Sequence, residues 1–281
     1  MSQSSRQTET IFCHAPLNYV DADGALPRQV PIRNGRIQAP GPWQVHGFER
    51  MDHESAVTNW LDPEEVATVH YPEIEAFAQQ LTGCTHALVA GHISRNPEQA
   101  AVHQDLAPIQ FVHSDFADSY GGLLRRTFGE ERNPGSGQAL RRAGITAEQA
   151  AAAARILVLQ FWRNVGERRM DLPIAFCDAT TVPRDHLQAF PVTNYADGGG
   201  PTFDTLGIHY PGTPDQHDWY TYPELQDKEV IAFRTYDTEA AARGEPYWTP
   251  HSAFPDPAVE PGKPSRMSIE LRATCLFFEA T

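Results

Sequence analysis

The sequence has 281 residues, of which 41% are hydrophobic and 21% charged, a composition typical of a globular chain that can bury a substantial core. The formal net charge of -14 and a pI near 5.2 argue against binding to nucleic-acid phosphates or to anionic membrane surfaces. The 23 prolines and 20 glycines favour short strands and loops over a helical bundle.

The cysteines and the N-terminal residues bear on the cellular compartment. The four cysteines are far apart in the sequence and form no CxxC pair, which predicts neither a disulfide framework nor a zinc ribbon. The first ten residues lack the basic-then-apolar pattern of a signal peptide, and no apolar run reaches about 18 residues. We therefore expect a cytoplasmic protein with no membrane partner.

The first hundred residues predict a hairpin followed by helices. Residues 11–20 and 29–37 are expected to form a small hairpin on the outside of the domain. Asp62 precedes Pro63 and two acidic residues, a pattern typical of a helix start. A second helix is expected to end at about Leu81, before Gly83, and residues 85–92 to form a strand.

The remainder of the chain alternates apolar runs with turns. Residues 109–112 predict a short buried strand, the NPGSG segment at 133–137 a flexible turn, and residues 146–155 a helix. Further strands are expected at 156–165, 172–177, 205–210, 218–221, 228–236 and 267–278. Many strands with a single clear helix predict an antiparallel sandwich or barrel. We expect one domain over residues 1–281, with a core at 105–278 on which residues 1–100 pack.

A histidine and an aspartate follow the short strand at 109–112. His113 and Asp115 are separated by one residue, so their side chains point to the same face of an extended backbone. An imidazole and a carboxylate that converge in this way are two of the three ligands of a 2-His-1-carboxylate iron site. A second His-x-Asp, His103 and Asp105, lies in a polar segment outside any expected strand, which makes it the weaker candidate.

The third ligand must come from another strand. His251 lies between the strand at 228–236 and the final strand, and it is the best candidate. His209, at the end of a strand, and His217, in a turn, are the alternatives that residue patterns leave open.

The final strand alternates strictly between polar and apolar residues. Arg266, Ser268, Glu270 and Arg272 share one face. An arginine and a serine two residues apart suit a dicarboxylate cosubstrate, because the guanidinium can bind a carboxylate with two hydrogen bonds. The alternative is a solvated outer face with an Arg–Glu pair.

Seven segments occur in a specific order between about residues 109 and 278. They are VHSDFAD, FWRNV, LPIAFCDATTV, HDWYTYPEL, EVIAFRTYD, PHSAFPDP and SRMSIELR. In this order they resemble a family of 2-oxoglutarate-dependent hydroxylases and desaturases of fungal and bacterial secondary metabolism. The resemblance implies a mostly β fold with flanking helices and a double-stranded β-helix core, the jelly roll that cupins share.

The resemblance also implies the site. Fe(II) would be held by His113, Asp115 and His251, and the 2-oxoglutarate C5 carboxylate by Arg266 with Ser268, with Arg272 as the next candidate. Trp162 and Trp219 are expected in the core. The candidate substrate contacts are Arg163 and Trp248.

The predicted activity is that of an oxygenase using Fe(II), 2-oxoglutarate and O2. It would hydroxylate, desaturate or oxidatively cyclise a small natural product or amino-acid derivative while 2-oxoglutarate is converted to succinate. The partners expected are a small-molecule substrate and a second copy of the chain. The alternatives are a cupin-like metal enzyme without 2-oxoglutarate and a non-catalytic jelly-roll binding module.

Overall fold

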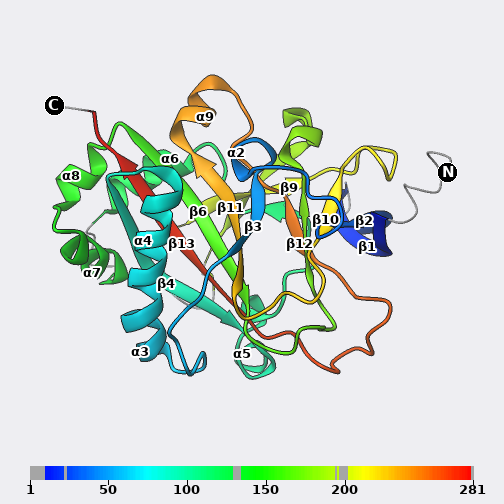
Figure 1. Ribbon diagram of the computed structural model, residues 1–281. Helices are drawn as coiled ribbons and strands as arrows, with labels where there is room; N and C mark the ends of the chain where they lie inside the picture. Colours follow the sequence, from blue (N-terminus) through cyan, green and yellow to red (C-terminus); the bar gives the residue numbers. More distant parts are fainter. Residues whose placement is uncertain (1–9, 22–23, 129–133, 194, 196–201, 280–281) are drawn as a thin grey trace.

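Two β-sheets pack face to face in the computed structural model, which describes residues 10–21, 24–128, 134–193, 195 and 202–279 (Figure 1). The larger sheet has eight strands in the order β1-β2-β10-β7-β12-β5-β9-β8. The strands are β1 Ile11–Asp21, β2 Gly24–Asn34, β5 His113–Ser114, β7 Ile174–Cys177, β8 Leu187–Val192, β9 Phe203–Ile208, β10 Trp219–Thr221 and β12 His251–Ala253.

The smaller sheet has five strands in the order β3-β11-β6-β13-β4, all paired antiparallel. They are β3 Phe48–Asp52, β4 His86–Arg95, β6 Arg155–Asn164, β11 Glu229–Asp237 and β13 Ser268–Phe277. The fold class predicted from the sequence, mostly β with flanking helices and a jelly-roll core, is confirmed.

The helices are short and flank the sheets (Figure 1). The α-helices are α2 Trp43–His46, α3 Pro63–Glu65, α4 Tyr71–Thr82, α5 Pro97–Val102, α6 Tyr120–Thr127, α7 Pro134–Ala143, α8 Ala147–Ala151 and α9 Thr238–Arg243. The helices with other hydrogen-bond patterns are η1 Val66–His70, η2 Gln104–Leu106, η3 Ala179–Thr181 and η4 Arg184–His186. No helix of the described residues is both long and apolar enough to cross a membrane.

The N-terminal strands are built into the sheets rather than packed outside them. β2 pairs parallel with β10, so the β1–β2 hairpin extends the larger sheet. β3 and β4 are the two edge strands of the smaller sheet. The prediction that residues 1–100 pack on a separate core therefore misses their contribution to both sheets.

The two predicted N-terminal helices are one continuous helical run. Asp62 caps its start by accepting from the backbone N–H groups of Glu64 and Glu65. The π-helical segment η1 lies just before Pro72. Proline lacks an N–H and its ring crowds the carbonyl four residues earlier, and the wider π turn accommodates both without ending the helix.

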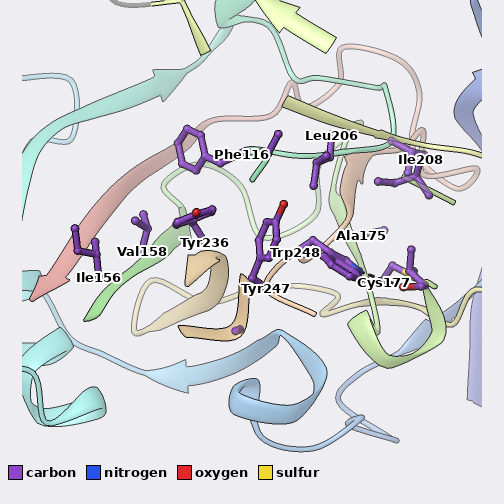
Figure 2. Close-up of a cluster of buried hydrophobic side chains, with 14 of the residues drawn as sticks. Phe116, Ile156, Val158, Ala175, Cys177, Leu206, Ile208, Tyr236, Tyr247 and Trp248 are labelled. Atoms are coloured by element: carbon purple, nitrogen blue, oxygen red, sulfur yellow. Dashed lines mark hydrogen bonds between the residues drawn. The ribbon is translucent and has the colours of Figure 1, made fainter. Parts of the chain in front are cut away.

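β6 and β13 of the smaller sheet each have one face toward α4 and one toward the larger sheet. In β6, Leu157, Leu159 and Phe161 pack with residues of α4, whereas Ile156 and Val158 belong to the core between the sheets. Figure 2 shows part of that inner core, including Ile156 and Val158. β13 alternates in the same way: its apolar residues pack with α4, and Ser268, Glu270 and Arg272 lie on the face toward the larger sheet.

Three local predictions differ from the structure. Residues 109–112 form no regular strand, and β5 consists only of His113 and Ser114. The expected turn at 133–137 is the start of α7, which begins at Pro134, while residues 129–133 lie outside the described part. The helix expected at 146–155 ends at Ala151, because β6 begins at Arg155.

Gly135 allows α7 to lie against β4. A Cβ built at Gly135 would lie 1.8 Å from the carbonyl oxygen of Ala90, which leaves no room for any side chain. In the same helix, a Cβ at Gly137 would lie 3.5 Å from Arg141 Nη1, an ordinary contact.

We expect Gly135→Ala to lower the free energy of unfolding by about 1–3 kcal/mol, because α7 must move away from β4. Gly137→Ala is the matched control and should stabilise by up to about 1 kcal/mol, since alanine favours a helix over glycine. Urea unfolding of both variants measures the difference. Equal stability of the two would show that the close approach of α7 to β4 is not required.

Candidate metal centre

Three potential metal ligands meet where β5 and β12 pair. His113 and His251 are directly opposite each other in this antiparallel pair, and their ring centroids are 4.3 Å apart. Asp115 follows β5 immediately. One ligand atom from each residue lies within 4.8 Å of the others, and all three side chains are buried. The structure therefore brings together the residues that the sequence predicted as ligands.

Both imidazole rings are oriented by their own backbone. His113 Nδ1 donates to the carbonyl oxygen of Phe111 at 2.7 Å, and His251 Nδ1 donates to that of Thr249 at 3.0 Å. A carbonyl can only accept, so the proton of each neutral ring is on Nδ1 and the lone pair is on Nε2. The Nε2 atoms lie 3.7 and 3.6 Å from Asp115 Oδ1.

The Asp115 carboxylate divides its two oxygens between an arginine and the histidine pair. Oδ2 accepts from Nε and Nη2 of Arg272 at 3.1 and 2.8 Å. Burial alone would raise the pKa of the carboxyl, but the charge of Arg272, with smaller contributions from the histidines, lowers it to about 2. Asp115 is therefore ionised, and its Oδ1 faces the two imidazoles.

The imidazole of His113 is neutral at physiological pH. Burial, reinforced by His251, lowers its pKa to about 4. A metal ion binds the unprotonated ring, so no proton has to be displaced from Nε2. Two imidazoles and one carboxylate on one side of a cavity can hold a divalent ion and leave its other positions open.

These groups form one wall of a cavity of about 560 Å³. The charged groups that the described residues contribute to it are three arginines and two carboxylates, namely Arg95, Arg266, Arg272, Asp115 and Glu270. Most of the remaining wall is apolar: Ile93, Ile109, Phe111, Phe116, Tyr120, Leu123, Leu124, Ile174, Val192, Phe203 and Ala253. Mostly apolar walls with a few converging polar groups are typical of a small-molecule site.

Arg266 lies in this cavity with no carboxylate partner among the described residues. Its Nε donates to Ser268 Oγ at 2.9 Å, its Nη1 lies 3.4 Å from the carbonyl oxygen of Leu172, and the guanidinium is 5.0 Å from the Trp162 ring centroid. Burial, reinforced by Arg95, lowers its pKa to about 9. A buried cation of this kind can bind the carboxylate of a ligand.

Sequence reasoning missed several cavity residues. Arg95 lies beyond the strand expected at residues 85–92, but β4 extends to it, and it pairs with Glu270. The α6 residues Tyr120, Leu123 and Leu124 also line the cavity. Their spacing of three and four residues is the signal that could have identified this helix.

The other histidine candidates lie elsewhere. His217 is buried outside the cavity, with Nε2 2.9 Å from His186 Nδ1. His209 does not line the cavity either. The Nδ1 of His103 accepts from the backbone N–H of Asp105, which caps η2.

Neither predicted substrate contact lines the cavity. Arg163 is on the α4 face of β6, two residues after Phe161, and it donates to the carbonyl oxygens of Asp227 and His53. Trp248 packs in the core between the sheets and donates to the carbonyl oxygen of Val182 (Figure 2). These two assignments do not fit the structure, because neither side chain is part of the cavity wall.

The sequence matches the model of one protein family over residues 10–276, described as Oxidoreductase/YMDC permease-like domain. The chain belongs to this family. A solved structure titled iron and alpha-ketoglutarate-dependent endoperoxidase NvfI superposes with a TM-score of 0.73 at 19% identity, covering 96% of this chain and 100% of the other. This likeness supports the jelly-roll fold.

Curated proteins to which this chain is similar include fungal dioxygenases and a fungal hydroxylase/desaturase. Alpha-ketoglutarate-dependent dioxygenase phiK, from a fungal species, is 25% identical over 231 residues, which cover 82% of this chain and 78% of phiK. Hydroxylase/desaturase efuI of Hormonema carpetanum is 24% identical, covering 83% and 77%. Fe(II)/2-oxoglutarate-dependent dioxygenase nvfI of Aspergillus novofumigatus is 24% identical, covering 90% and 84%. The family resemblance predicted from the order of the seven segments is confirmed.

The ion pair with Arg272 sets the charge of Asp115, and a variant can test this. In metal-free Arg272→Met, the pKa of Asp115 should rise, because burial is no longer opposed by the guanidinium. The ionised carboxylate contributes to the free energy of unfolding at neutral pH, and this contribution is lost as pH falls through the pKa of Asp115. Because that pKa is higher in the variant, the loss should begin at a higher pH.

Carboxyl-carbon NMR titration measures this pKa, and Asp115→Asn identifies the signal. The wild-type signal should stay that of a carboxylate down to acid unfolding. A variant signal that also stays unchanged to that point would show that Arg272 does not control the ionisation of Asp115.

Proposed function

We propose that this protein is an Fe(II)- and 2-oxoglutarate-dependent oxygenase that hydroxylates, desaturates or oxidatively cyclises a small organic substrate. One observation carries the proposal. Two Nε2 lone pairs and one carboxylate oxygen converge on a cavity that also contains Arg266, a buried guanidinium with no carboxylate partner among the described residues. The names of the curated relatives support the same activity.

The donor set suits ferrous iron. Two imidazole nitrogens and one carboxylate oxygen are the ligands of the facial triad, which leaves open positions for a keto acid and O2. His113, Asp115 and His251 would hold the ion. The carbonyls of Phe111 and Thr249 fix the imidazoles, and Arg272 fixes the carboxylate so that Oδ1 is available.

The keto acid would be held by Arg266. Its guanidinium would bind the C5 carboxylate of 2-oxoglutarate with charge-assisted hydrogen bonds. Ser268 Oγ accepts from Arg266 Nε, so the hydroxyl hydrogen remains free to donate to the same carboxylate. In this arrangement Arg272 is a positioning residue for Asp115 rather than a ligand of the keto acid.

When bound, iron, 2-oxoglutarate and O2 supply the oxidation of an unactivated C–H bond, coupled to loss of CO2 and formation of succinate. The chain contributes a dry and shaped cavity. Phe111, Phe116 and Tyr120 exclude water, and they aim the substrate at the metal by packing against it.

The alternative functions need fewer of these features. A cupin-like enzyme without 2-oxoglutarate would have no use for a buried Arg266, and a binding module would need no triad. A single oxygenase domain, a homodimer and a cytoplasmic location stay predictions of the sequence.

Removal of any one ligand should abolish the metal-dependent spectrum. Anaerobic titration of the wild-type protein with Fe(II) and 2-oxoglutarate should give a weak visible charge-transfer band. His113→Ala, Asp115→Ala and His251→Ala should each lose it, whereas His217→Ala should keep it. A band that survives His251→Ala would show that the third ligand is another residue.

The two cavity arginines should have separable roles. Arg266→Met should weaken 2-oxoglutarate binding about 10- to 100-fold, the loss expected for hydrogen bonds to a charged group, with little change in Fe(II) affinity. Arg272→Met should instead weaken Fe(II) binding about 10- to 100-fold, as is usual when the residue orienting a ligand is removed. Anaerobic calorimetry of each variant with each component measures both. The reverse pattern would assign the keto acid to Arg272.

A further inference from the structure

Glu270 is a buried carboxylate that the metal centre does not use. It lies on β13 between Ser268 and Arg272, on the face turned toward the cavity. It also lines a neighbouring cavity of about 310 Å³ between β4, β13, α6 and α7. The two cavities share Ile93, Tyr120, Leu124, Thr127, Glu270 and Arg272. Glu270 is therefore at their junction.

One oxygen of Glu270 is fully engaged by Arg95. Oε1 accepts from Nε and Nη2 of Arg95 at 3.1 and 2.9 Å. The remaining donors of Arg95 bind the carbonyl oxygens of Asp105 and Ala107 and the hydroxyl of Tyr195. Arg95 is anchored at several points, so it holds the carboxylate in one orientation.

The other oxygen, Oε2, accepts no hydrogen bond from the described residues. It is not among the fully sealed, unpaired polar atoms of the described residues, of which Gln160 Oε1 is one. The charge of Arg95, followed by that of Arg272, keeps the pKa of Glu270 below its usual range despite burial. Glu270 Oε2 is therefore a rigid, ionised hydrogen-bond acceptor in the wall of the cavity.

The surroundings define what can bind this acceptor. Among the described residues, three arginines face two carboxylates in the larger cavity. Fe(II) would add two positive charges and 2-oxoglutarate two negative ones, so the net charge stays positive and an ammonium group is disfavoured. A neutral hydroxyl donates a hydrogen bond without adding charge. The apolar side chains of Phe116, Leu123 and Leu124 require an apolar body for the rest of the substrate.

We propose that Glu270 Oε2 is a substrate-positioning acceptor that binds a hydroxyl group of a neutral, otherwise apolar substrate lying across the two cavities. This inference rests on the proposed oxygenase function and names the substrate class of the same site. Arg95 and Tyr195 serve to hold Glu270 in place.

The test uses adamantanol and its methyl ether, two apolar probes that differ in the ability to donate. The wild-type protein, loaded anaerobically with Fe(II) and 2-oxoglutarate, should bind the alcohol about 10- to 100-fold more tightly in calorimetry. In Glu270→Gln, the amide can still accept from Arg95 but presents an N–H to the cavity. The ether can accept from that N–H, so the preference for the alcohol should disappear.

Glu229→Gln is the matched control. Glu229 is equally buried and paired with Arg36 and Arg50, but it lines neither cavity. This variant should lose stability and keep the preference for the alcohol. If Glu270→Gln also keeps the preference, Glu270 is only the counter-ion of Arg95 and the inference is wrong.

A second comparison does not depend on the variant folding. Fluoroadamantane is close in size to the alcohol but cannot donate, so the wild-type protein should bind it as weakly as the ether. Tight binding of the fluoride would overturn the inference.

Two further titrations separate the two proposals: Fe(II) with 2-oxoglutarate alone, and the two probes with protein that holds neither. A preference for the alcohol in protein that fails to bind iron and keto acid would support the Glu270 acceptor and overturn the oxygenase function. Binding of iron and keto acid without any preference for the alcohol would do the reverse.

Discussion

The ionised Asp115 carboxylate can be buried beside two imidazoles because the Arg272 guanidinium donates two hydrogen bonds to it. An unpaired ionised carboxylate in such surroundings would take up a proton, and it would then be a poor metal ligand. Arg272 comes from β13, 157 positions further along the sequence. The site therefore depends on the packing of the smaller sheet against the larger one, which brings β13 to the end of β5.

β13 links the stability of the fold to the chemistry of the site. Its outward residues, among them Ile269 and Leu271, pack with α4, and its inward residues face the cavity. The period-2 pattern of this strand made both faces predictable from the sequence. The pattern could not show which arginine would pair with which acid. Arg272 binds Asp115, and the partner of Glu270 is Arg95 from β4.

Other parts of the site could not be predicted because they depend on tertiary contacts. β6 is buried on both faces, so its residues do not alternate between polar and apolar, and the sequence does not show which face lines the cavity. The prediction that Arg163 faces the cavity is therefore wrong: this residue lies on the face toward α4. α7 begins in a Pro-Gly-Ser-Gly segment that local propensity favours as a turn. Gly135 is required there by the approach to Ala90, a contact between segments far apart in the sequence.

The three ligands are held by interactions of different range, which has a consequence for how the site forms. Each histidine donates to a carbonyl two residues earlier in its own segment, so its tautomer is fixed as soon as that segment is extended. Asp115 keeps its charge on burial, and takes up its orientation, only when Arg272 of β13 is in place. A disturbance of the contacts between α4 and β13 would therefore release the carboxylate first, while both imidazoles would still present Nε2 to the cavity.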